Sequence, residues 1–109
     1  MQEPTFLILT ALAAGSRHGY GLIKDVEQLS RGDVQLRVGT LYGALDRLAG
    51  EGLVEVESEE VVDSRLRRNY RLTPQGAERL EAEALRSRRQ AEAALRRLRA
   101  ARPARGGLA

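Results

Sequence analysis

A basic cluster between residues 64 and 71 is the part of the sequence best equipped to bind an anion. The segment SRLRRNYR contains four arginines and no acid. Arginine offers a planar fork of N–H donors that matches the oxygens of a phosphate group. We expect Arg65, Arg67 and Arg68 to contact double-stranded DNA, either at its phosphates or in its minor groove.

The same arginines have a competing use inside a β-hairpin. The segment that precedes the cluster carries acids at alternate positions, Glu55, Glu57 and Glu59. Arg67 and Arg71 could pair with these acids across two antiparallel strands, and each such pair contributes roughly 0.2 to 1 kcal/mol. We expect both uses, with strand arginines paired and with Arg65 and Arg67, next to the turn, available to phosphate.

A second set of candidate contacts lies on the helix predicted at residues 38–50. Leu41, Leu45 and Leu48 recur at helical spacing and predict its buried side. At 100° per residue, the outward and flanking positions are Gly39, Thr40, Tyr42, Gly43, Asp46 and Arg47. This outward side is the one that would meet DNA.

Four side chains on or beside this helix can bind DNA. Thr40 and Tyr42 carry hydroxyls that donate to phosphates or base edges. Arg37 and Arg47 are longer cationic arms. The alternative is that all four are ordinary solvated positions of a surface helix. Asp46 weakens the electrostatic case, because an acid facing a groove repels phosphate unless it accepts from a cytosine amino group or pairs with an arginine.

Periodicity and turn residues predict the elements that position these side chains. Helices are predicted at residues 4–14, 20–31, 38–50 and 74–102, and strands at 53–59 and 68–72. This order predicts a mainly α fold with a small β-hairpin, a winged helix-turn-helix followed by a long C-terminal dimerisation helix. We expect a DNA-binding domain at 1–73, a dimerisation helix at 74–102 and a flexible tail at 103–109.

Two of these helices carry more apolar surface than a small domain can cover. The helix 4–14 is apolar nearly all round, and a long lone helix needs a partner for its apolar stripe. The last helix carries a seam of small residues with leucine at its ends: Leu80, Ala84, Ser87, Ala91, Ala94 and Leu98. We expect a homodimer whose interface includes Phe6, Leu7, Leu80, Ala84, Ala91 and Leu98. The alternative is a last helix folded back on its own domain.

Composition excludes several classes of function. The 109 residues hold no cysteine and a single histidine, His18, which removes thiolate chemistry and sites built from several Cys or His ligands. No nucleophile–base pair or metal-ligand spacing is present, so we expect no enzyme, cofactor or metal site. The apolar run 6–14 is too short to cross a bilayer, and the N-terminus lacks the positive start of a signal peptide. We expect a cytoplasmic protein without a membrane partner.

Three short motifs follow one another along the chain. They are HGY at 18–20, GTLY at 39–42 continued by ALDRLAGEGL at 44–53, and YRLTPQG at 70–76. In this order and spacing they resemble the PadR family of bacterial transcription regulators. The resemblance implies a winged-helix dimer that binds a roughly palindromic operator, usually as a repressor, with the C-terminal helix pairing alongside the first. It assigns DNA contacts to Thr40, Tyr42 and the basic wing at 65–68, and structural roles to the HGY motif.

The sequence also departs from the family pattern. Family wings often carry Gly-Arg-Pro ahead of the tyrosine, whereas this one reads DSRLRRN at 63–69. Some relatives bind flat aromatic compounds at the dimer centre, but here only Phe6 among the aromatics lies on an expected dimer element. The sequence therefore argues against a stacking pocket and specifies no small-molecule effector. A second class of function stays open, a winged-helix module that docks an acidic protein partner through its arginine-rich last helix.

Overall fold

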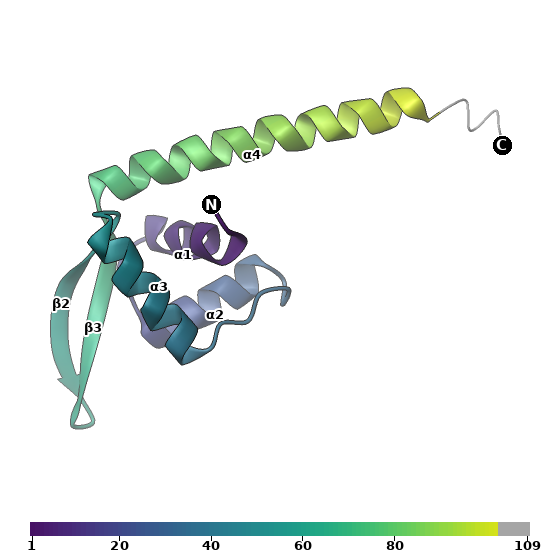
Figure 1. Cartoon of the computed structure of the whole chain (residues 1–109). Helices are drawn as coiled ribbons and strands as arrows, with labels where there is room; N and C mark the ends of the chain where they lie inside the picture. The colour runs from purple at the N-terminus through teal and green to yellow at the C-terminus, as the bar shows by residue number, and fades with distance from the viewer. Residues whose placement is uncertain (103–109) are drawn as a thin grey trace.

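The computed structural model of the chain describes residues 1–102, which form helices and a small antiparallel sheet (Figure 1). The elements in chain order are α1 (Glu3–Ala13), β1 (Arg17–His18), α2 (Gly19–Leu29), α3 (Val38–Gly50), β2 (Val54–Val62), β3 (Arg65–Leu72) and α4 (Pro74–Ala101). The predicted fold class, mainly α with a small hairpin and a long last helix, is confirmed. The tail predicted at 103–109 lies outside the described residues.

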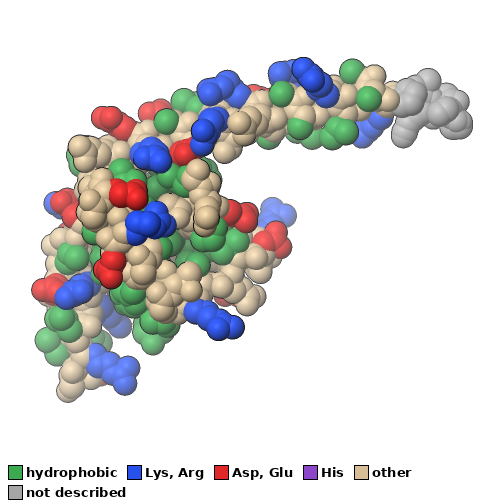
Figure 2. Space-filling model, viewed as in Figure 1, with side chains coloured by type: hydrophobic (Ala, Val, Ile, Leu, Met, Phe, Trp, Pro, Cys, Tyr) green, Lys and Arg blue, Asp and Glu red, His purple; other side chains and the backbone are tan. Residues whose placement is uncertain are grey.

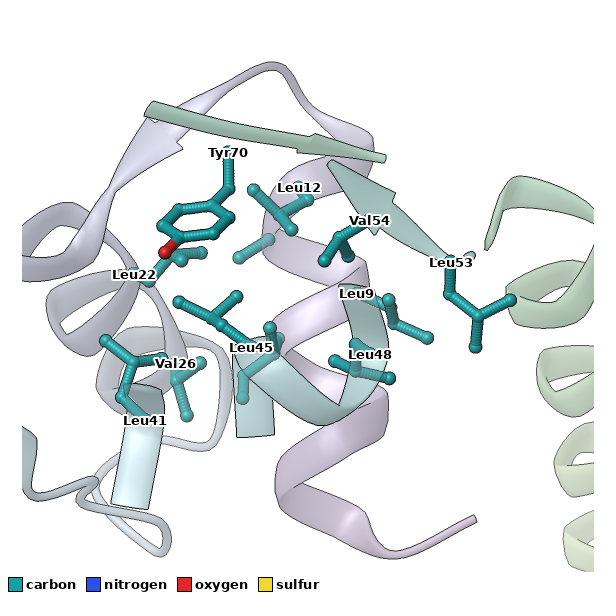
Figure 3. Close-up of a cluster of buried hydrophobic side chains, with 12 residues drawn as sticks. Leu9, Leu12, Leu22, Val26, Leu41, Leu45, Leu48, Leu53, Val54 and Tyr70 are labelled. Carbon is teal, nitrogen blue, oxygen red and sulfur yellow. The ribbon is translucent and has the colours of Figure 1, made fainter. Parts of the chain in front are cut away.

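One hydrophobic core lies between α1, α2, α3 and the inner end of the sheet (Figure 3). Its fully buried side chains are Ile8, Leu9, Leu22, Val26, Leu41, Leu45 and Leu48. Burying one such side chain contributes about 1.5 to 3 kcal/mol. Because three of these leucines belong to α3, the core holds that helix on the body and leaves its opposite face outward.

The sheet has three strands in the order β1-β3-β2, where the sequence predicted two. β1 is only two residues long and pairs Arg17 with Tyr70 and His18 with Asn69, which is too short to leave a periodic pattern. β2 and β3 also extend further than predicted, to Val62 and from Arg65. The outer half of this hairpin has no core beneath it, so neither of its faces must be apolar and the alternation that marks a strand is lost.

We refer to β2, β3 and their connection, residues 54–72, as the wing. Its connection is the two-residue turn Asp63-Ser64, and both residues adopt positive φ angles of 51° and 64°. Positive φ at both central positions is the geometry that a right-twisted hairpin requires of a two-residue turn. A register shift between Val56 and Ser58 marks a β-bulge that separates the buried base of the wing from its exposed outer half.

Side-chain caps fix where α2 and α4 begin. His18 Nδ1 accepts a hydrogen bond from the backbone N–H of Gly21 at 3.3 Å. Thr73 Oγ1 accepts one from the N–H of Gly76 at 2.9 Å. A Cβ at Gly76 would overlap the carbonyl oxygen of Leu53, so the backbones approach there as only glycine allows. These contacts set the direction in which α4 leaves the sheet.

α1 is covered by its own chain more fully than its sequence suggests. It contacts α2, α4 and β3, and its buried residues include Ile8, Leu9 and Leu12. Phe6 and Leu7 are half-buried, and Leu7 packs against the core. The expectation that α1 exposes a large apolar surface is therefore wrong, because α4 of the same chain lies over it.

α4 packs on the body only along its first turns. Gly76 and Glu83 are buried, and Leu80 packs against the core. Beyond them the helix extends past α1 and away from the body (Figure 1), and Leu95 and Leu98 are 53% and 61% exposed. A helix folded back on its own domain therefore describes only the start of α4. No helix within residues 1–102 combines the length and apolarity needed to cross a membrane.

Candidate nucleic-acid interface

The outer face of α3 is open and lacks bulky side chains. Arg37, Gly39, Thr40 and Gly43 are exposed along its first turns. A Cβ added at either glycine would meet no atom within 4 Å, so neither glycine is needed for packing inside the chain. Glycine lowers helix propensity by about 1 kcal/mol relative to alanine. The two glycines leave a face that another backbone, such as that of a DNA strand, can approach closely.

Tyr42 is partly exposed to solvent and partly packed against the start of α2. The residue is 39% exposed, yet its hydroxyl lies so close to Gly19 that a Cβ at Gly19 would overlap it. The tyrosine thus joins the start of α2 to the start of α3. A glycine at position 19 is what lets Tyr42 lie there, and this contact supports the structural role expected for Gly19.

Tyr20 lies on the surface, although the resemblance gave it a structural role. Its side chain is 66% exposed. Together with His18, Tyr42 and the end of the wing it lines one groove between α2, α3 and the wing, to which Arg65 and Arg67 also contribute. We call this the α3–wing groove. Sequence reasoning missed Tyr20, because its surface position depends on the contact between Gly19 and Tyr42, which no local pattern indicates.

The wing arginines fall into two pairs with different surroundings. Arg68 Nε donates to Glu59 at 2.8 Å and Arg71 Nε donates to Glu55 at 2.7 Å. The hydrogen bond from Arg68 to Glu59, with a second to Tyr70, raises the pKa of the Arg68 guanidinium above its usual value. Arg68, predicted to contact DNA, is therefore held by a strand acid instead of projecting freely.

Arg65 and Arg67 have no carboxylate oxygen within 4.0 Å among residues 1–102. Glu60 is the register partner of Arg67, but its carboxylate accepts a hydrogen bond from Asn69 Nδ2 at 3.4 Å. The expectation that Arg65 and Arg67 stay unpaired agrees with these distances. Arg71 pairs with a strand acid as the hairpin alternative proposed, whereas Arg68 and not Arg67 forms the second pair. Two cations next to the groove are thus uncommitted.

Arg47 is not brought together with the other predicted contacts. Its Nη2 donates to Thr5 Oγ1 at 2.9 Å, and its Nη1 lies 3.8 Å from Glu51. The guanidinium therefore lies against α1, away from the groove. The i, i+4 spacing indicates the pairing of Arg47 with Glu51, whereas no local pattern indicates the contact with Thr5. Asp46 is exposed, and nothing in the described structure explains it.

The residues predicted for a dimer interface divide along α4. Leu80 is half-buried against the core of its own chain, as Leu7 of α1 is, and Phe6 is also half-buried. The later seam positions are exposed: Ala84, Ser87, Ala91, Ala94 and Leu98. The exposed part of the seam therefore begins directly after the buried Glu83.

Glu83 ties the start of α1 to α4. Its carboxylate lies 3.4 Å from the N-terminal ammonium of Met1 and accepts a hydrogen bond from Arg86. Burial alone would raise the pKa of Glu83, but the combined effect of Arg86 and the ammonium outweighs burial and lowers that pKa. The ion pair joins α4 to the N-terminal end of α1.

A model of the transcriptional regulator PadR-like family matches residues 8–82. The transcriptional regulator Rv3488 of Mycobacterium tuberculosis is 44% identical over 69 residues, which are 63% of this chain and 61% of the relative. The transcriptional regulator YqjI of Escherichia coli is 35% identical over 79 residues, 72% of this chain and 36% of that protein. An uncharacterised 37.1 kDa transposon protein of Streptomyces fradiae is 44% identical over 82 residues, 75% of this chain and 22% of its own length. The chain thus spans between about a fifth and three fifths of these relatives.

Solved structures share the fold. A PadR family transcription regulator from Clostridium difficile superposes with a TM-score of 0.74 at 24% identity, covering 89% of this chain and 99% of that one. Bacillus subtilis PadR in complex with operator DNA gives a TM-score of 0.68 at 19% identity, covering 76% and 48%. The matched family is one of transcriptional regulators, not of enzymes. Since the family model spans well over half of the residues, the chain belongs to the PadR-like family of transcriptional regulators.

Proposed function

We propose that the chain is a sequence-specific DNA-binding regulator that represses transcription by binding a pseudo-palindromic operator as a homodimer. The observation that carries this proposal is the α3–wing groove, where the open face of α3 lies beside Arg65 and Arg67, which have no carboxylate partner among residues 1–102. Family membership supports it, as does the fold shared with Bacillus subtilis PadR, whose structure is a complex with operator DNA.

In the proposed complex α3 enters the major groove of the duplex. A helix fits that groove, and in helix-turn-helix proteins the N-terminal part of the second helix contacts base edges. Arg37, the N-cap residue of α3, and Thr40 in its first turn lie at that end of the helix and are exposed. Tyr42 and Tyr20 contribute hydroxyls at the side of the groove, where phosphates would pass. Arg47 is not among the proposed contacts.

The wing supplies the charge. Arg65 and Arg67 would reach the phosphates or the minor groove next to the site of α3, because the wing projects beyond the body on that side (Figure 1). Their guanidinium groups are free to exchange water for phosphate oxygens. Arg68 could contact DNA only if a phosphate replaced Glu59 as the partner of its guanidinium group.

Dimerisation would use the projecting part of α4. We propose residues 1–73 as the DNA-binding domain and 74–102 as the dimerisation helix, whose exposed seam includes Ala91 and Leu98. A second copy would cover the leucines that the body leaves exposed. Two-fold symmetry would then place two α3 helices on half-sites about 34–36 Å apart, one turn of the duplex, or a multiple of it.

A charge placed in the seam tests the dimer. Ala91→Glu with Leu98→Glu should give monomers in sedimentation velocity. Ala100→Glu is the matched control, because nine residues place it on the opposite side of the helix from Ala91. A dimer that persists in the double variant, or is lost equally in the control, contradicts this use of the seam.

Selection of duplexes from a random pool, followed by fluorescence anisotropy at several salt concentrations, tests the DNA proposal. We expect a pseudo-palindromic sequence that binds at least about a thousand-fold more tightly than random duplex, with affinity falling as salt rises. A reporter gene with that sequence at its promoter should lose expression when the protein is supplied. Binding no tighter than to random DNA would overturn the proposal, and a rise in expression would reverse the proposed sign of regulation.

One observation favours a second function. Residues 86–102 hold seven arginines and one acid, a net charge of +6, on the half of α4 that leaves the body. Such a helix could dock an acidic protein, with DNA irrelevant. Arg65→Ala with Arg67→Ala separates the two functions, since loss of regulation in cells supports DNA binding and retained regulation supports the acidic partner.

A further inference from the structure

Two apolar side chains stand exposed at the tip of the wing. Val61 and Leu66 are register partners across β2 and β3, and they are 72% and 59% exposed. Val61 is the most exposed large hydrophobic side chain among the described residues. Hydrophobic side chains stand out beside basic ones on the wing at the lower left of Figure 2. The core does not use this pair, because it lies beyond the bulge and away from the body.

Two arginines flank Leu66 along β3. Because side chains alternate between the faces of a strand, Arg65 and Arg67 lie on the face opposite Leu66, and Arg68, paired with Glu59, shares its face. Arg65, Leu66 and Arg67 all line the α3–wing groove. Neither Arg65 nor Arg67 has a carboxylate within 4.0 Å in residues 1–102. A protein partner is a poor fit for this tip, because a stable protein interface buries about 1,200 Å² or more and two side chains supply far less. Apolar tips flanked by cations fit the minor groove of a duplex, which is narrow and negative in potential.

The wing is built to hold its tip in place. β3 is hydrogen-bonded to β2 along its length and, at Asn69 and Tyr70 toward the inner end of the wing, also to β1. Two ion pairs, Arg68–Glu59 and Arg71–Glu55, join the strands on the way to the tip. The turn that closes the wing has only two residues. Because the strands are paired up to a two-residue turn, the side chains at the tip keep a fixed position. They can therefore contact a duplex without first ordering a long flexible loop.

We infer that Leu66, supported by Val61, acts as an apolar wedge that enters the minor groove beside the site of α3 and partly unstacks one base step. Arg65 and Arg67 bind the phosphates on either side. Apolar wedges of this kind kink a duplex by about 20 to 90° toward the major groove. Pyrimidine–purine steps such as TA deform most easily, so the wedge selects operators with such a step where the wing lands. This inference rests on the proposed DNA-binding function.

The test compares the wild-type chain with a double variant, Val61→Thr with Leu66→Thr, which keeps residues that favour strands. The probe is the selected operator duplex with a donor and an acceptor dye at its two ends. A second series of duplexes moves a single TA step through a flank that is otherwise an A-tract. Val56→Thr is the matched control, because Val56 lies on β2 at the inner end of the wing and is itself 43% exposed.

For the wild type and the control we expect energy transfer to rise on binding, and the TA step at one flank position to tighten binding about five-fold or more. The double variant should lose both effects. Its affinity should still fall with salt as steeply as that of the wild type, because both arginines remain. Equal circular dichroism spectra and melting temperatures establish that the variant is folded.

Three other results would each overturn the wedge. If the double variant bends the operator and prefers the TA step as the wild type does, the wedge is wrong while DNA binding stands. If the wild type neither bends the operator nor discriminates the step, the wedge is wrong as well. If the wild type selects no sequence at all, the proposed function fails, and the wedge fails with it for that separate reason.

Discussion

The outer face of α3 and the wing border the same groove, but they are built differently. α3 is held by Leu41, Leu45 and Leu48, none of which has any exposed surface. Its outer face has two open glycines, and one acid, Asp46, offsets the cation at its start. The wing has a buried base, whereas its outer half is largely exposed and carries Arg65 and Arg67, which have no carboxylate partner among residues 1–102.

This difference indicates that α3 contributes mainly a fixed shape to DNA binding and that the wing contributes mainly charge. A helix fixed by a core and nearly neutral on its outer face can contribute position and directed hydrogen bonds, but little long-range attraction. The wing contributes attraction, because unpaired guanidinium groups release counterions from phosphates when they bind. Changes on α3 should therefore alter folding or fit, and changes on the wing should alter the salt dependence of binding.

The largest expected effect follows from the anchoring of α3. Leu45→Ala should lower the free energy of unfolding by about 2 to 5 kcal/mol, because it opens a cavity in a packed core. Leu66→Ala on the wing should change that free energy by no more than about 0.5 kcal/mol, because the side chain contacts little. Urea titrations followed by circular dichroism measure both. If the two variants lost similar amounts of unfolding free energy, Leu66 would contribute to the stability of the fold despite its exposure, and the contrast between α3 and the wing would be wrong.

The next effect concerns charge. Arg65→Ala with Arg67→Ala should weaken binding of the selected operator about ten-fold or more, and should lower the slope of log affinity against log salt by about 1.8, or 0.9 per lost phosphate contact. Arg88→Ala with Arg89→Ala removes the same charge from α4 and is the control. An unchanged slope in the wing variant, or an equal change in the control, would remove the wing from the interface.

Sequence reasoning succeeded where burial imposes a period. The predicted bounds of α3, residues 38–50, match the structure because its leucines recur on a face that the core covers completely. It failed on the wing for the opposite reason, since no core enforces alternation past the bulge at Val56/Ser58. The same bulge sets the register that pairs Arg68 with Glu59, so which wing arginine is unpaired could not be read from spacing.

The candidate site was only partly predictable for a related reason. Thr40 and the wing arginines follow from local patterns, but the placement of Arg47 depends on Thr5, which is 42 positions away in the chain. The surface position of Tyr20 depends on how α2 meets α3 at Gly19. Contacts between distant segments decide both cases, and a helical wheel contains no such information.

A glycine of α3 offers a test in which stability and affinity move in opposite directions. Gly43→Ala should raise the free energy of unfolding by about 0.5 to 1 kcal/mol, because alanine favours helix and the added methyl group meets nothing. It should weaken operator binding, because the methyl group holds the backbone away from the duplex. Gly50→Ala, at the other end of the helix and equally open, should stabilise without weakening. Unchanged operator affinity in Gly43→Ala would mean that close approach is not why residue 43 is glycine.

The smallest expected effect lies at the wing turn, where Asp63 and Ser64 hold left-handed backbone angles without glycine. Asp63→Asn with Ser64→Gly gives the pair that this turn type favours, and should raise the free energy of unfolding by up to about 1 kcal/mol. It also removes a carboxylate that lines the groove beside Arg65, so operator affinity at low salt should rise by less than the loss seen for the arginine variant. Asp63→Asn alone separates charge from turn geometry, since it should raise affinity while changing stability little. A fall in affinity for Asp63→Asn would show that this acid contacts a base directly and that the tip of the wing reads sequence as well as charge.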